Sequence, residues 1–426
     1  MTSLLALLRQ NRNYRYTWFG QAVSETGDYF NNVAVFALAM KESQSGLVVS
    51  GVMLARAIPA VLAGPIAGVL LDRLDRRRIM IASDLVRAVV ALAFLLTIHQ
   101  PRPWLLYLLS AMLMFASPFF TSGRAAILPT IATPGELHTA NSLTQTTQWA
   151  TLTAGTLLAG ISAARFGYGW AFVINSLSFL FSAWAIWKIA APGGFRAGHA
   201  SAARHVRPWH EYHEGLRYMR SVPLLMGIGM ISAGWAMGGG AAQILFALFG
   251  EQVFHRGAAG IGNIWGFAGI GLLLGGAIGH IVGSRGGYAG YKRAVTISYL
   301  GHGFAYILFS QAESFVMALV CMMFSRVGMA VTSVLNNSQL LLHTPNQFRG
   351  RIFATLESIR WSVMILSMAA AGIASQYTGP RTIGLIAGAL GSITAIMWAW
   401  WDWSGRLPEP APVENGQPAA VLERLT

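Results

Sequence analysis

One long apolar run early in the chain limits what this sequence can fold into. The run extends from Leu47 to Leu71 and holds a single charged residue, Arg56. A helix of about 20 apolar residues covers the roughly 30 Å hydrocarbon core of a bilayer, so this run is long enough to span a membrane. It ends at a basic cluster, residues 73–78, and basic residues collect on the cytoplasmic side of membranes. The segment therefore predicts a membrane-spanning helix and its orientation.

Runs of the same kind recur along the whole chain. Of its 426 residues, 54% are hydrophobic and only 11% are charged, whereas a soluble domain carries roughly 25% charged residues. We therefore predict an all-α membrane protein with about twelve transmembrane helices, separated by charges, Pro or Gly. The expected spans are residues 16–40, 47–71, 79–98, 104–125, 142–164, 169–190, 224–249, 258–283, 294–311, 314–335, 352–376 and 382–403.

The basic residues are distributed unequally over the connections between these spans. If the chain starts inside, most Lys and Arg fall in the even-numbered connections, which predicts that both termini are cytoplasmic. This asymmetry, with few acidic residues, explains the net charge of +14 without a nucleic-acid partner. The single cysteine, Cys321, allows no intramolecular disulfide and is expected to be an inert apolar residue.

The longest connection, Pro192 to Pro223, divides the predicted spans six and six. Trp209, Tyr212, Leu216 and Met219 form an apolar stripe in it, which predicts a short amphipathic helix on the inner leaflet. His210 and His213 have no third ligand nearby, so we expect no metal site. The expected parts are two six-helix halves, a linker with this helix, and a disordered cytoplasmic tail: residues 1–191 and 224–403, 192–223, and 404–426.

The two halves also resemble each other in sequence at a common offset of about 210 residues. The segment 35–38 matches 245–248, the glycine pair 64 and 68 matches 275 and 279, and a Pro loop near 134 matches one near 345. Parallel repeats related by an axis along the membrane normal are a transporter architecture, with the substrate site between the halves near the midplane.

The connection after the second span carries a pattern that resembles a known family. Gly68, Asp72, Arg73, Arg76 and Arg77 fit the G-x-x-x-D-R-x-x-R-R signature of the major facilitator superfamily, although Asp75 stands where a Gly is usual. Further motifs resemble the bacterial branch of macrolide-efflux and enterobactin-export proteins. They are the segments 11–15, 27–28, 54–59, 83–87 and 134–143.

This resemblance implies the major facilitator fold, the bacterial inner membrane and a gating role for the basic loop. It implies that Asp72 meets the N-terminus of the eleventh helix, where the free amides and the positive helix end favour a carboxylate. It also implies that the loop arginines pair with acids on neighbouring helices, for which Asp84 and Glu136 are the candidates. The alternative is that the cluster only fixes topology.

Charged residues inside the predicted spans are candidate functional groups because they are costly in hydrocarbon. Glu25 and Asp28 lie one turn apart in the first span, and counting at about 1.5 Å per residue places Asp28 beyond the midplane. Burial and close spacing favour proton uptake by carboxylates, which is the chemistry of a proton-coupled antiporter. The alternative is a structural ion pair of these acids with Arg56.

Two pairs of charged residues and one single arginine also lie within the predicted spans. Asp84 with Arg87, and Glu357 with Arg360, have i, i+3 spacing and are read chiefly as structural pairs. Arg326 stands alone near the middle of the tenth span and is a candidate for an anionic substrate or a carboxylate of the first span.

The sequence favours a secondary transporter, a monomer that works with a small-molecule substrate, protons and the lipid bilayer. The first hypothesis is proton-driven export of lipophilic or amphipathic compounds by alternating access. The second is an exporter or flippase for one physiological solute, such as a siderophore or a lysophospholipid, and the third is a scaffold or sensor that transports nothing. No P-loop and no catalytic constellation occurs, so we expect neither an enzyme nor a cofactor.

Overall fold

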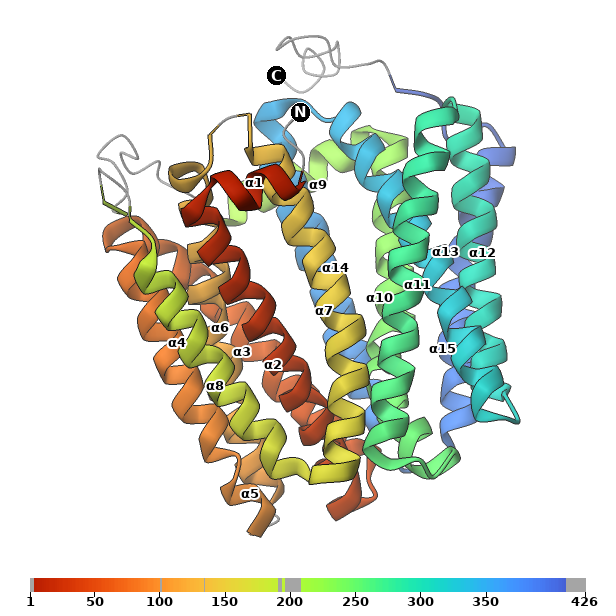
Figure 1. The fold of residues 1–426 in the computed structure, drawn as a ribbon. Helices are drawn as coiled ribbons and strands as arrows, with labels where there is room; N and C mark the ends of the chain where they lie inside the picture. The colour runs from red at the N-terminus through yellow and green to blue at the C-terminus, as the bar shows by residue number, and fades with distance from the viewer. Residues whose placement is uncertain (1–3, 100–101, 134, 191–193, 196–207, 411–426) are drawn as a thin grey trace. The chain divides into compact units, whose positions relative to one another are not determined.

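The computed structural model describes residues 4–99, 102–133, 135–190, 194–195 and 208–410 (Figure 1). All regular structure in these ranges is helical, which confirms the predicted fold class. Twelve of the described helices have 18 or more residues: α2 (Arg12–Ser43), α3 (Gly46–Arg73), α4 (Arg76–Ala93), α6 (Pro103–Ile131), α7 (Leu137–Phe166), α8 (Tyr168–Lys188), α10 (Pro223–Leu248), α11 (Gly257–Arg285), α12 (Tyr288–Gln311), α13 (Phe315–Leu342), α14 (Asn346–Ala374) and α15 (Pro380–Trp403).

The shorter elements are helical as well. They are α1 (Leu4–Gln10), α5 (Leu96–His99), α9 (Pro208–Ser221) and the π-helical turn η1 (Phe249–Val253). Nine helical stretches of the described chain are long and apolar enough to cross a membrane, judged by length and composition, whereas α2, α7 and α12 are too polar to meet that measure. Polar side chains of α2 and α7 bond to one another where these two helices meet.

Several helices are longer than their apolar runs predict. α6 continues to Ile131 instead of ending near residue 125, and α13 continues to Leu342 instead of 335. α7, α12 and α14 begin five or six residues before the expected start, at Leu137, Tyr288 and Asn346. These extensions lie at the ends predicted to face the cytoplasm. Backbone hydrogen bonds continue the helix past the point where hydropathy falls, so hydropathy alone marks the ends too early.

Contacts divide the chain into two compact units. The first consists of Met1–Ala202 with Phe246–Gly269, and the second of Ala203–Leu245 with Ile270–Thr426. In the first unit, α2 packs against α7 and α8, α3 against α6, and α4 against α6 and α8. In the second unit, α12 packs against α13 and α15, and α9 against α14. The proposed division into six-helix halves at residues 191 and 224 stays a prediction.

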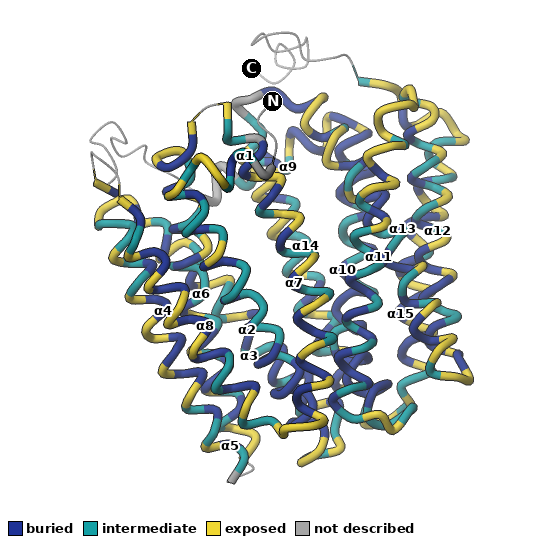
Figure 2. The backbone as a smooth tube through the Cα atoms, viewed as in Figure 1, coloured by how far each residue is buried: buried dark blue, intermediate teal, exposed yellow. Residues whose placement is uncertain are grey.

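The surfaces of these helices carry many apolar side chains. Figure 2 shows exposed and buried residues alternating along most helices. Ile58, Leu62, Ile66 and Val69 lie at helical spacing on one face of α3 and are 43–62% exposed. Continuous apolar faces of this size are rare on soluble monomers, whereas hydrocarbon chains of lipid cover them at no cost.

The amphipathic helix predicted in the long connection is present as α9, and its buried face packs on protein. Glu214 forms an ion pair with Arg351 of α14 at 2.7 Å. The Tyr218 ring stacks on Phe348 with centroids 4.8 Å apart, and Met219 is buried in the core of the second unit. The side chain of Trp209 lies outside the described residues, as does the tail from residue 411 onward. Before that point the chain is held in place, because Leu407 is buried in the same core.

Helices α7 and α11 approach closely within the first unit, and glycines make the approach possible. A Cβ atom added to Gly262 would lie 2.5 Å from the carbonyl oxygen of Thr156 and 2.8 Å from the Cα atom of Gly160. Small residues at such crossings allow backbone contact between membrane helices. By contrast, a Cβ atom at Gly64 or Gly68 would meet nothing within 4 Å.

We expect Gly262→Ala to destabilise the protein by about 1–3 kcal/mol, because the added methyl group cannot fit between the two backbones without moving them. The matched control is Gly64→Ala, where a Cβ atom has open space. The measurement is the thermal unfolding midpoint of each purified protein in the same detergent. Equal midpoints for the two variants would contradict the close contact.

Candidate functional site

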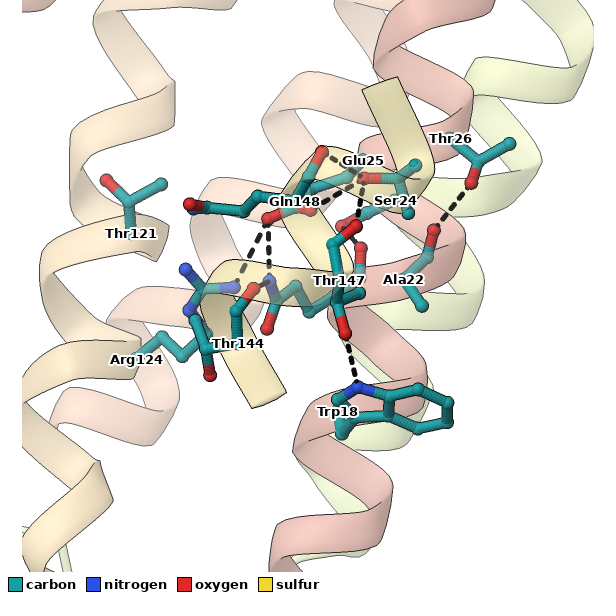
Figure 3. A network of polar contacts seen from close by, with 12 residues as sticks. Trp18, Ala22, Ser24, Glu25, Thr26, Thr121, Arg124, Thr144, Thr147 and Gln148 are labelled. Carbon is teal, nitrogen blue, oxygen red and sulfur yellow. Dashed lines mark hydrogen bonds and ion pairs between the residues drawn. The ribbon is translucent and has the colours of Figure 1, made fainter. Parts of the chain in front are cut away.

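Glu25 lies inside the first unit at the centre of a polar network (Figure 3). Its carboxylate pairs with the Arg124 guanidinium of α6, with Nη1 3.3 Å from Oε1. Gln21 of the same helix donates to Oε1 at 2.9 Å, and the Thr151 hydroxyl of α7 lies 3.1 Å from Oε2. Three helices, α2, α6 and α7, therefore meet at one carboxylate. The Glu25 and Arg124 side chains are only 22% and 12% exposed.

The network continues along the face where α2 and α7 meet. The indole nitrogen of Trp18 donates to the Thr147 hydroxyl at 2.7 Å, and Gln21 also reaches the Thr144 carbonyl oxygen at 3.3 Å. Figure 3 shows Trp18, Thr144, Thr147 and Gln148 near Glu25, where the two helices meet. Hydroxyl and amide groups of this kind satisfy a buried charge without adding another one.

Arg124 was missed by the sequence analysis. It is the second-last residue of the predicted span 104–125 and was not considered as a charged residue within the membrane. Because α6 continues to Ile131, Arg124 lies about two turns inside the helix end. The sequence did contain a signal for a longer helix. The segment 125–128, between Arg124 and Pro129, has no Gly and no charged residue that would end the apolar helix there.

Asp28 lies one turn beyond Glu25 on α2, and its surroundings differ. Its Oδ1 atom is buried and accepts no hydrogen bond from any described residue. The opposite charges that act on it most strongly are those of Arg87 and Arg56. The guanidinium group of Arg56 is itself held by the side-chain amide oxygens of Asn31, at 3.4 Å, and Asn32. Among the described residues, no direct ion pair joins Arg56 to Glu25 or Asp28.

Asp84 and Arg87 form the expected i, i+3 ion pair, and both side chains are almost completely buried, at 0% and 2% exposure. The Arg87 guanidinium lies 4.3 Å from the ring centroid of Phe179 and 4.8 Å from that of Phe120. One oxygen of Asp84, Oδ2, has no hydrogen-bond partner in the described chain. The pair thus carries charge into the interior of the first unit, close to Asp28.

The basic loop after α3 bonds mainly to backbone carbonyl oxygens, including those of α6 and α8. Arg76 donates to the carbonyl oxygens of Leu71 and Ala126 at 3.2 and 2.9 Å, and lies 3.9 Å from the Asp72 carboxylate. Arg77 donates to the carbonyl oxygens of residues 186 and 187 of α8. The Asp75 side chain accepts from the Arg78 amide at 3.0 Å and caps α4, which gives a role to the residue that departs from the signature.

Glu136 directly precedes α7. Its side chain connects Thr133, which follows α6, with Asn11, which precedes α2. Its Oε2 accepts from the Thr133 amide at 2.9 Å, the Thr133 hydroxyl at 3.0 Å and the Asn11 side chain at 3.3 Å. Within the described ranges, neither Glu136 nor Asp84 pairs with an arginine of the basic loop. The gating roles of Gly68, Asp72, Arg73 and the rest of this set stay a prediction.

In the second unit, Arg326 is 8% exposed on α13 and lies beside the Met329 sulfur at 3.4 Å. Glu357 and Arg360 of α14 form the expected i, i+3 pair, and Glu357 also accepts from the Trp361 indole at 2.8 Å. No three His, Cys, Asp or Glu side chains of the described chain come together as metal ligands would.

Long helices with exposed apolar faces, enclosing charged side chains, define a multi-pass membrane protein with a polar site inside. A sequence profile of the Major Facilitator Superfamily matches residues 17–366, and the chain belongs to this family of transporters. Among solved structures, the nucleoside transporter NupG aligns with a TM-score of 0.72 over 92% of this chain and 99% of its own, at 11% identity, a similarity of fold alone.

Relatives of known sequence include transporters and exporters. YfiS of Bacillus subtilis (strain 168), an uncharacterized MFS-type transporter, is 26% identical over 90% of this chain and 92% of its own length. BacE of the same organism, a proposed bacilysin exporter, is 25% identical over 88% and 91%. Macrolide efflux protein A of Streptococcus pyogenes is 29% identical over 31% and 33%. The family resemblance read from the sequence motifs is thereby confirmed.

We expect Arg124→Met to destabilise the protein by about 1–3 kcal/mol, because it leaves the Glu25 carboxylate enclosed without its counter-charge. The double variant Glu25→Gln/Arg124→Met should regain at least half of that loss, since a neutral amide needs no cation. Thermal unfolding of wild type, both single variants and the double variant measures the coupling. A double variant as unstable as Arg124→Met would show that the two residues are not coupled.

The Glu136 contacts predict a pH effect with a definite sign. The Thr133 amide that donates to Glu136 lowers the pKa of this carboxyl below its ordinary value of 4.5. Its stabilising contribution is therefore present above pH 4.5 and is lost as pH falls through the lower pKa of the folded protein. We expect the unfolding midpoint of wild type to exceed that of Glu136→Gln at pH 6 and the two to converge in acid. A gap that stays constant with pH would contradict this role.

Proposed function

We propose that this transporter exports lipophilic or amphipathic small molecules from the bacterial cytoplasm in exchange for protons. The observation that carries the proposal is the pair of acids on α2, Glu25 and Asp28, enclosed among helices of the first unit. Enclosed carboxylates change charge state with surrounding conditions more readily than paired surface groups do. In a membrane such groups mark ion and substrate pathways.

Glu25 is proposed as the residue that couples a proton to a change in side-chain contacts. In the ionised state it holds Arg124, Gln21 and Thr151 around one carboxylate. A proton on this carboxylate cancels the charge that binds Arg124, so that the guanidinium is released from α2. Proton binding thereby loosens the junction of α2 with α6, and proton loss restores it.

Asp28 is proposed as the group at which substrate and proton compete. Its buried Oδ1 has acceptor capacity that no described residue uses. A cationic or hydrogen-bond-donating substrate supplies the missing partner to the ionised form, and a proton supplies it by neutralising the group. Because both cannot be bound to the same oxygen, proton entry favours substrate release. This exclusion is the basis of antiport by alternating access.

Export, rather than uptake, is supported by the relatives. BacE carries the name of a proposed bacilysin exporter, and another relative is a macrolide efflux protein. With the basic loop on the cytoplasmic side, both termini of the monomer are cytoplasmic and the bilayer is the bacterial inner membrane. The loop set Gly68, Asp72, Arg73, Arg76 and Arg77, with Asp84 and Glu136, is proposed to act in gating.

A second candidate function is transport of one physiological solute, such as a siderophore or a lysophospholipid. The Asp28 oxygen without a hydrogen-bond partner supports this second function equally well, because a donor group of the solute can bond to it without any proton being exchanged. In that case the carboxylates are substrate ligands and a pH gradient does not drive transport. Substrate breadth and the effect of the gradient separate the two functions.

The experiment is transport into proteoliposomes with and without an imposed pH gradient, using lipophilic cations and a siderophore. We expect the gradient to drive accumulation by wild type, and Asp28→Asn and Glu25→Gln to lose that drive by at least tenfold while substrate exchange without a gradient continues. Glu42→Gln is the matched control, because Glu42 is an exposed carboxylate at the other end of the same helix.

Two results would decide against proton antiport. The first is wild-type transport that proceeds equally well without any gradient. The second is a full response to the gradient in the double variant Glu25→Gln/Asp28→Asn. Loss of drive in the Glu42→Gln control would instead mean that the assay reports general damage to the helix, and the assignment to the two enclosed acids would then fail.

A further inference from the structure

A cavity that opens at the surface of the second unit has neither Glu25 nor Asp28 in its lining. It lies between α10, α12, α13 and α14, and its volume is about 150 Å³. All of its lining residues belong to the second unit. An engineered protein cavity of about this volume accommodates benzene, so the space fits one six-membered ring.

Two aromatic rings in the wall offer apolar surface and no free polar atom. The Trp235 indole nitrogen donates to the Met329 sulfur at 3.0 Å. The Tyr299 hydroxyl donates to the Ile231 carbonyl oxygen at 3.2 Å. Because these polar atoms are engaged, the rings are left to make van der Waals contact with a flat or apolar ligand face.

Hydrogen-bonding capacity comes instead from side chains on α13 and α10. The Asn336 amide oxygen accepts from the Tyr291 hydroxyl at 2.9 Å, which fixes the side chain and leaves its amide nitrogen to donate. Ser232 and Ser333 add two hydroxyl groups to the wall. These amide and hydroxyl groups can bond to a ligand that supplies matching donors and acceptors, and a ligand without them leaves them unpaired.

The charges at this cavity cancel. Glu357 and Arg360 are its only charged lining residues in the described chain, and they form an ion pair with each other. Arg360 also lies 5.7 Å from the centroid of the Trp235 ring, and Glu357 accepts from Trp361. With both charges partnered, the wall has no net charge to attract a cation or an anion. The cavity therefore suits a neutral group.

We propose that this cavity binds an uncharged six-membered ring carrying several hydroxyl groups, of the glycosyl type, as part of the exported molecule. Hydroxyl groups both donate and accept, which matches a wall whose serine hydroxyls do both and whose asparagine donates. The CH faces of such a ring pack against Trp235. The proposal rests on the proposed export function, and it narrows the substrate class from lipophilic compounds in general to those with a neutral hydroxylated ring.

The test is direct binding to the full-length protein in lipid nanodiscs at one uniform pH. Glucoside and maltoside detergents are avoided throughout, because they carry the ring under test. The probes are methyl β-D-glucopyranoside, its cationic relative D-glucosamine, and cyclohexanol, followed by saturation-transfer NMR with empty nanodiscs as the blank. We expect the glucoside to bind at least tenfold more tightly than either of the other two.

Matched variants on one helix separate the cavity from general effects. Ser333→Ala removes a hydroxyl from the cavity wall, so we expect about tenfold weaker glucoside binding. Ser338→Ala removes a hydroxyl of the same helix that bonds only to its own backbone, to Val334 at 2.9 Å, and should leave binding unchanged. Trp235→Leu removes the aromatic wall and should weaken binding of both the glucoside and cyclohexanol.

Three results would overturn the proposal: no glucoside binding by wild type, cyclohexanol or glucosamine binding as tightly as the glucoside, or equal affinity in wild type and Ser333→Ala. Since no pH gradient is applied, these results are independent of proton coupling. If binding fails while gradient-driven export persists, only the ring site is wrong. If binding holds while the gradient has no effect, only the antiport proposal is wrong.

Discussion

The cost of enclosing charge in a low-dielectric interior governs the first unit. A carboxylate among membrane helices is tolerated only where a cation and hydrogen-bond donors surround it. Glu25 meets that condition through Arg124, Gln21 and Thr151, which come from three helices. The pairing therefore holds α2, α6 and α7 in register at one point. Any process that changes the charge of Glu25 must act on the packing of all three.

Much of the fold could be predicted from the sequence, because hydropathy and charge asymmetry are local properties. The twelve long helices follow from apolar runs, and the family follows from the loop signature at Asp72 and its neighbours. Helix ends were predicted less well, since α6 and α13 continue into polar sequence where backbone hydrogen bonding is still satisfied. Arg124 lies at the end of the predicted span but well inside the observed helix, and its pairing with Glu25 was not predicted.

Contacts between residues that are distant in the chain could not be predicted from hydropathy or charge asymmetry. The sequence offered Arg56 as a partner for the acids of α2, but Asn31 and Asn32 occupy its guanidinium group. Nothing in the spacing of these residues distinguishes an amide from a carboxylate as the partner across a helix interface. The cavity beside Trp235 was equally hidden, because its walls come from four helices spread over more than a hundred residues.

The polarity of α2 also bears on how the protein is made. α2 and α7 fall short of the apolar character that lets a single helix partition into lipid, whereas α3 and α8, which follow them, have it. Insertion during synthesis depends on that partitioning, helix by helix. We therefore expect α2 to enter the bilayer only together with α3, and α7 only together with α8. The polar residues of α2 and α7 thus make biogenesis of the protein depend on pairs of helices entering the bilayer together.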